Sequence, residues 1–175
     1  MRWRNPDLGQ VSPLEFIPLL EANGGIHRVG LWAIDTALLQ LRRMIDVAGD
    51  RALFVNVNLS PEQLSRSGII EQLMLTLSRH GLSPHNLNLE ITETAMNSDE
   101  NLAIEHLRQL RDAGFGVYID DFGTGHSTLE RLVTCPFNGL KIDRSFVNKI
   151  EEGGTQLAVL RAILTMASLL NLRVT

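Results

Sequence analysis

Gly116-Val117-Tyr118-Ile119-Asp120-Asp121 decides the fold: it is a short apolar, β-branched run that ends in two acids. Four similar runs occupy residues 53–58, 87–91, 139–143 and 172–174, and longer segments of helical period separate them. This alternation is the sequence form of repeated βα units and predicts an α/β protein with a parallel sheet. A (β/α) barrel and a doubly wound sheet both satisfy it. No glycine-rich dinucleotide fingerprint follows any of the runs, which favours the barrel.

The segments between the runs carry helix signals. A helix with one buried stripe is predicted from apolar residues that step by three and four, namely Leu31, Ile34, Leu38, Leu41 and Ile45. Ser60, followed by Pro61 and Gln63, has the pattern of a capping box at a helix start. A last helix is expected to open at Thr155 and to carry on one side Leu157, Leu160, Leu164 and Ala167.

Composition bounds the class of protein. The 175 residues are 44% hydrophobic, enough for one core, so residues 1–175 are expected to form a single domain. Sixteen basic against 20 acidic residues give a charge of -4, so neither a nucleic-acid polymer nor an anionic membrane is expected as a partner. Cys135 is the only cysteine, which excludes an internal disulfide and agrees with a reducing cytoplasm. No apolar run approaches the roughly 20 residues of a membrane span, and no signal-peptide region is present, so export and anchoring are not expected.

Polar side chains occupy the carboxyl ends of the predicted strands. They are Asn58, Glu90, Asp120, Asp121, Lys141 and Asp143. In a parallel barrel all strand carboxyl ends open onto one face, so residues far apart in sequence meet there. Hard oxygen ligands, with no histidine or cysteine at ligand spacing, favour Mg²⁺ or Mn²⁺ over zinc. The pattern therefore predicts a divalent-metal site suited to phosphate chemistry.

The adjacent acids Asp120 and Asp121 need positive charge beside them if both are to ionise. Two metal ions about 4 Å apart would supply it, hold a phosphodiester oxygen and lower the pKa of a bridging water. Lys141 would then orient or deprotonate that water, or balance charge. Each residue alone has an ordinary alternative, because strand-end acids are often helix caps and an Asp-Asp pair before glycines is often a turn. The set as a whole favours the metal site.

Five motifs resemble, in order along the chain, those of the bacterial EAL domain family: Arg2-Trp3-Arg4, Val57-Asn58-Leu59-Ser60, Leu89-Glu90-Ile91-Thr92-Glu93, Asp120-Asp121-Phe122-Gly123-Thr124-Gly125 and Lys141-Ile142-Asp143-Arg144-Ser145-Phe146-Val147. Residues 12–18 match a further segment, so the resemblance spans essentially the whole chain. It implies a modified (β/α) barrel that hydrolyses cyclic dimeric GMP (c-di-GMP) to its linear dinucleotide with Mg²⁺ or Mn²⁺.

The same resemblance assigns residues to the metals. Asn58, Glu90 and Asp120 are expected to be ligands, and Asp121 is expected to hold the second ion. These are the residues that strand-end chemistry also singles out. The resemblance thus adds that two ions are expected and which residues would hold each of them.

Further roles follow from the resemblance. Lys141 would assist the attacking water, and Glu93 would steady the glycine-rich loop after the acid pair, a loop also implicated in dimer contacts. Arg2 is expected to contact a substrate phosphate, and Asp143 is expected to be a second substrate-binding residue.

The chain departs from the family pattern at both ends. The family's Glu-Ala-Leu stands just before the step that here reads Met1-Arg2-Trp3, and the last run should lead into Ala-Glu-Gly-Val-Glu. We therefore expect a partial (β/α)8 TIM-type barrel without its first strand region and last βα units, with little or no turnover. Unpaired sheet edges need cover, which predicts a homodimer.

Two other functions stay open. The chain would be a non-catalytic module if it binds c-di-GMP or a protein partner without full metal ligation. It would be a barrel aldolase if Lys141 formed a Schiff base. The acid cluster argues against the aldolase, because such a lysine needs an apolar or cationic neighbourhood.

Overall fold

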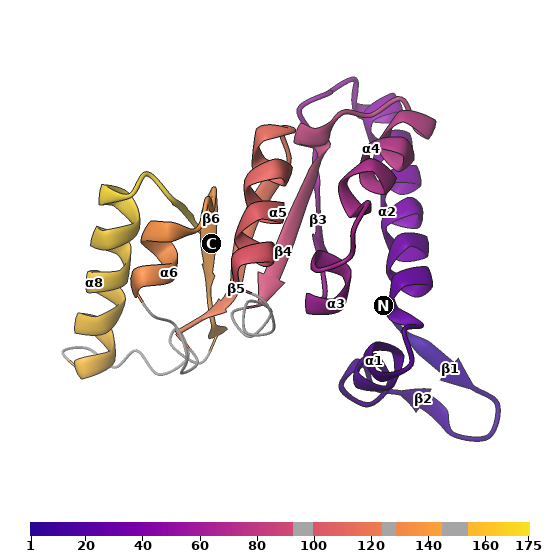
Figure 1. The fold of residues 1–175 in the computed structure, drawn as a ribbon, viewed down its shortest axis with the longest axis horizontal. Helices are drawn as coiled ribbons and strands as arrows, with labels where there is room; N and C mark the ends of the chain where they lie inside the picture. Colours follow the sequence, from indigo (N-terminus) through magenta and orange to yellow (C-terminus); the bar gives the residue numbers. More distant parts are fainter. Residues whose placement is uncertain (93–99, 124–128, 145–153) are drawn as a thin grey trace.

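The computed structural model describes residues 1–92, 100–123, 129–144 and 154–175 and contains a five-stranded parallel sheet with helices beside it (Figure 1). Its elements are β1 (Trp3–Asn5), β2 (Gly9–Val11), α1 (Pro13–Ala22), α2 (Ile26–Ala48), β3 (Val55–Asn58), α3 (Pro61–Leu64), α4 (Ile69–Arg79), the 3₁₀ helix η1 (Pro84–Asn86), β4 (Leu87–Thr92), α5 (Glu100–Asp112), β5 (Gly116–Phe122), α6 (Leu129–Thr134), β6 (Gly139–Ile142), α8 (Thr155–Leu169) and β7 (Arg173–Val174). Within these ranges, no helix combines the length and apolar character that a membrane span requires.

The sheet order follows the chain order, β3-β4-β5-β6-β7, and every pair is parallel. Each strand therefore pairs with the next one along the chain, which is the strand order of a (β/α) barrel. The predicted α/β class with a parallel sheet is confirmed.

The two faces of the sheet differ in chemistry. One face packs against the helices and is almost fully buried, with Leu87, Leu89, Ile91, Val117, Ile119 and Leu140 at 0–1% exposure. The register aligns a polar series on the other face, with Asn58 beside Glu90 and Glu90 beside Tyr118. Because successive side chains of a strand alternate between faces, the helix-side apolar residues force their polar neighbours onto the open face.

The helix starts and stripes follow largely from the sequence. In α2 the predicted stripe is buried at Ile34, Leu38, Leu41 and Ile45, and Leu31 is half-buried. The capping box of α3 is confirmed, since the Gln63 amide donates to Ser60 Oγ and the Ser60 amide donates to Gln63 Oε1, both over 3.3 Å. In α8 the prediction is wrong for Leu164, which is 43% exposed. Among the described α8 side chains, Ala167 is buried as predicted, and Ile163, the residue before Leu164, is buried instead of Leu164.

An antiparallel hairpin, β1–β2, lies with α1 at one end of the molecule, apart from the parallel sheet (Figure 1). Its turn is held by Asn5, whose side-chain oxygen accepts from the amides of Asp7 (2.8 Å) and Leu8 (3.0 Å). Trp3 packs edge-on against Phe16 of α1, with ring centroids 5.8 Å apart. The hairpin is therefore attached through aromatic contact with α1.

Candidate functional site

A lysine and two carboxylates form the centre of the site at the carboxyl ends of three strands. Lys141 Nζ on β6 donates to Glu90 Oε2 on β4 over 2.8 Å and lies 3.1 Å from Asp120 Oδ1 on β5. The side chains of Glu90, Asp120 and Lys141 are 7%, 16% and 29% exposed. Residues 51 positions apart in the chain thus share one ion-pair cluster, as the strand-end pattern predicts.

Strand register brings further polar residues to this edge. Asn58 of β3 aligns with Glu90, and Thr92 aligns with Asp120. Asn58, Glu90 and Thr92 also line a single groove of about 630 Å³ between β3 and the helices α1 and α2. Thr92 was not singled out from the sequence, although its place two residues after Glu90 puts it on the same face.

A β-bulge in β5 presents both acids of the pair to one lysine. Ile119 aligns with Leu140 and Phe122 with Ile142, so two residues of β5, Asp120 and Asp121, lie opposite the single residue Lys141. The extra residue takes a left-handed conformation, with φ +54° at Asp121. The Asp121 amide donates to Asp120 Oδ1 over 3.0 Å, which supports the bend.

The electrostatics of the cluster are strongly negative. Partial burial of the carboxyl raises the pKa of Asp121 above its usual 3.8, and the charges of Asp120 and Asp143 raise that pKa further. Burial alone would lower the pKa of Lys141, but its hydrogen bonds to Glu90 and Asp120 outweigh this and raise that pKa above 10.5. Lys141 is therefore held as an ammonium ion.

The residue types of the cluster fit a hard divalent cation. The carboxylates that act on Asp121, together with its own, number four, Glu90, Asp120, Asp121 and Asp143, against the one ammonium of Lys141. After burial, the charges of the neighbouring carboxylates are the next causes that raise the pKa of Asp121, and Lys141 offsets them only in part. Carboxylate and amide oxygens are the donors that Mg²⁺ and Mn²⁺ prefer. Among the described residues, however, no three acidic, histidine or cysteine side chains are already arranged around a common cation position.

The other predicted site residues lie elsewhere or outside the described ranges. Arg2 lines two grooves near the hairpin, one with Trp3 and Trp32 and one with Gln10, and not the groove of Asn58 and Glu90. Its predicted phosphate contact stays a prediction. Glu93 lies outside the described residues. Asp143 joins the cluster through its charge on Asp121.

A model of the EAL domain family matches residues 1–175. The chain belongs to the EAL domain family. The resemblance expected from the motifs is thus confirmed. Phosphodiesterases of this family are generally metal-dependent.

Known EAL proteins are similar to this chain in sequence and fold. The chain is 37% identical over 174 residues to the bifunctional diguanylate cyclase/cyclic di-GMP phosphodiesterase MucR of Pseudomonas aeruginosa, covering 99% of this chain and 25% of that protein. It superposes on the PaMucR phosphodiesterase in its c-di-GMP complex with a TM-score of 0.88 and 38% identity, covering 99% of this chain and 70% of that one. For the EAL enzyme Bd1971 in its cAMP- and cyclic-di-GMP-bound form, the TM-score is 0.90 at 35% identity, with 99% and 48% covered. The chain thus spans about a quarter of the curated relative.

Proposed function

We propose that the acid–lysine cluster, defined as Asn58, Glu90, Asp120, Asp121, Lys141 and Asp143, is the site of an EAL-type phosphodiesterase that hydrolyses c-di-GMP to the linear dinucleotide. The observation that carries the proposal is the placing of Lys141 between Glu90 and Asp120 at the carboxyl ends of three parallel strands. Several similar structures are c-di-GMP complexes by description, which supports the choice of substrate.

The metal in this proposal is Mg²⁺ or Mn²⁺, held by Asn58, Glu90 and Asp120, with Asp121 at a second ion. When bound, such ions polarise the phosphodiester and lower the pKa of a coordinated water. The bulge at Asp120 and Asp121 supports the two-ion arrangement, because it places two successive acids opposite the single residue Lys141.

The side chains themselves would orient the reacting groups and balance the charge of the phosphate. Lys141 donates to Glu90 and lies 3.1 Å from Asp120, so it orients both carboxylates and offers positive charge to a phosphate oxygen or the attacking water. Asp143 adds negative charge near Asp121 and is proposed to contact substrate. Arg2 is proposed to reach a substrate phosphate, and Glu93 to steady the loop that follows β5.

A Schiff-base role for Lys141 is disfavoured by its neighbours. A reactive amine needs its pKa lowered by apolar or cationic surroundings. Two carboxylates lie within 3.1 Å of Lys141 Nζ and favour the ammonium form. The aldolase alternative is therefore not proposed.

A second candidate function is a non-catalytic module that binds c-di-GMP or a protein. One observation favours it: Lys141 already occupies the position between Glu90 and Asp120, where a cation would have to compete with it. In such a module the ammonium would take the place of a metal and phosphate binding would need no cation.

Two measurements separate the candidates. Chromatography of c-di-GMP incubated with Mn²⁺ would detect the linear dinucleotide, and calorimetry with and without Mn²⁺ would detect binding. Product from the natural chain and none from Asp120→Asn supports the hydrolase. Binding without product, unaffected by Mn²⁺, supports the module. Neither binding nor product would refute both the hydrolase and a module that binds c-di-GMP.

We also propose that two copies pair and that the protein is cytoplasmic. The sheet leaves the outer edges of β3 and β7 without a strand partner in the described part of the chain, and such edges invite pairing. Light scattering that finds only monomers would contradict the pairing, and fractionation of the producing cells tests the location.

A further inference from the structure

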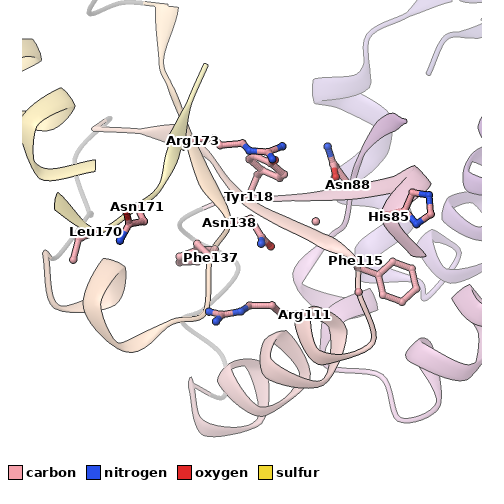
Figure 2. A pocket seen from close by; sticks show the side chains of 12 residues that line it. His85, Asn88, Arg111, Phe115, Tyr118, Phe137, Asn138, Leu170, Asn171 and Arg173 are labelled. Carbon is pink, nitrogen blue, oxygen red and sulfur yellow. The ribbon is translucent and has the colours of Figure 1, made fainter. Parts of the chain in front are cut away.

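A second polar cavity lies at the opposite end of the sheet from the acid–lysine cluster. It encloses about 630 Å³ at the amino ends of the strands, where β4, β5 and β6 begin (Figure 2). Its polar wall comes from η1, β4, α5, β7 and the turns before β6 and β7, through His85, Asn88, Arg111, Asn138, Asn171 and Arg173. The cavity uses none of the residues assigned to the phosphodiesterase site.

The cavity is positively charged in an acidic protein. Arg111 and Arg173 line it, and none of the described lining residues is an aspartate or glutamate, although the whole chain carries a charge of -4. Neither arginine forms an ion pair with a described residue. Figure 2 shows them on different sides of the cavity, with Asn138 between them. Two unneutralised guanidinium groups around one hollow create a local attraction for anions.

The neutral residues of the wall are already oriented. Asn138 accepts a hydrogen bond from the Val117 amide over 2.8 Å, so its side-chain NH₂ remains available as a donor. Asn88 donates to Asn56 over 3.0 Å, which fixes its side-chain amide on the floor of the cavity. An amide held by the fold can bind a ligand without losing rotamer freedom at that moment.

Two glycines leave room for the Tyr118 ring on the floor of the cavity. A Cβ at Gly116 would collide with the Asn88 side chain and lie 3.0 Å from the Tyr118 ring. At Gly139 a Cβ would lie 2.7 Å from the other side of the same ring. The Tyr118 ring thus stands over two glycines on the open face of the sheet, where it forms an aromatic wall of the cavity.

We propose that this cavity binds a phosphate-bearing small molecule. Its volume lies within the usual range for small-ligand sites, about 300 to 1,000 Å³. The planar guanidinium fork matches phosphate oxygens in geometry as well as charge, so Arg111 and Arg173 supply the affinity. Asn138 supplies a neutral donor and Tyr118 an apolar wall for whatever the phosphate carries.

Calorimetric titration of the full chain with inorganic pyrophosphate and with adenosine monophosphate tests the site. Each of Arg111→Gln and Arg173→Gln should weaken binding about tenfold or more, since each removes a charge-assisted hydrogen bond. Arg108→Gln is the matched control, an exposed arginine of the same helix that does not line the cavity, and should leave binding within about twofold.

Comparing the two probes shows which part of a ligand the cavity recognises. Equal affinity would mean that phosphate alone is bound, and tighter binding of the nucleotide would mean that the aromatic wall contributes. Both results support the site. Absence of binding for both anions, or equal affinity in the natural chain and both cavity variants, would overturn it. A thermal melt of each variant confirms that it is folded.

Discussion

Replacing Lys141 by methionine tests whether the acid–lysine cluster depends on its one cation. The change keeps the length of the side chain and removes the ammonium. Glu90, which is only 7% exposed, would then lose its hydrogen-bond partner and face Asp120 without compensation. A buried carboxylate left unpaired costs far more than a surface one.

The magnitude follows from the two contacts. A hydrogen bond to a charged group contributes about 1.5 to 3 kcal/mol. Water reaches Lys141, which is 29% exposed, so values near the lower end apply. We expect roughly 2 kcal/mol from the contact with Glu90 and about 1 from the longer one with Asp120, or about 3 kcal/mol in the free energy of unfolding.

Urea denaturation followed by circular dichroism at neutral pH measures this loss. The double variant Glu90→Gln/Lys141→Met has no unpaired Glu90 carboxylate. It should therefore be destabilised by less than the sum of the two single variants, and the difference, the coupling free energy, should be near 2 kcal/mol. Arg43→Met controls for removal of a cation from an exposed helix position and should change stability by less than about 0.5 kcal/mol. A coupling below about 0.5 kcal/mol would refute the reasoning, because the two side chains would then be independent.

Three further changes test the surrounding structure. Gly139→Ala places a Cβ 2.5 Å from a backbone oxygen of β7 and should destabilise the protein by about 1 to 3 kcal/mol in urea, and a neutral result would show that β6 and β7 can separate. Ser60→Ala removes the capping box of α3 and should lower the free energy of unfolding by about 1 kcal/mol. Ser78→Ala, at an exposed helix position, should leave it unchanged, and equal effects of the two changes would show that the cap does not stabilise the protein. Burial and then the charge of Glu62 raise the pKa of Glu21 above 4.5, so the folded protein binds that proton more tightly and loses stability as the pH rises through the raised pKa. Glu21→Gln should therefore raise the free energy of unfolding at pH 7, by no more than about 1 kcal/mol, and should not raise it below pH 4.5. A gain of equal size at the two pH values would contradict the assignment.

Much of the sheet could be predicted because its apolar residues must face the helices. Leu89, Val117 and Leu140 are buried on one side, so the polar residues between them are turned to the other side by strand geometry. The meeting of Glu90, Asp120 and Lys141 follows from that alternation together with the parallel arrangement.

Other features depend on contacts that a linear pattern does not contain. The strands of the β1–β2 hairpin have three residues each, too few to show a period, and the hairpin depends on the Asn5 turn and the contact of Trp3 with Phe16. The exposure of Leu164 depends on which side of α8 meets the sheet. The Asp-Asp pair fits a turn as well as a bulge until its pairing with β6 is known.

That bulge means the second acid is an addition to a strand that is already complete. Phe122, not Asp121, takes the core position beside Ile142, so a β5 shortened by that one aspartate would still place Asp120 toward the site and the phenylalanine in the interior. Chemistry at this edge can therefore be gained or lost by inserting or deleting a single residue, while the packing beneath it stays as it was.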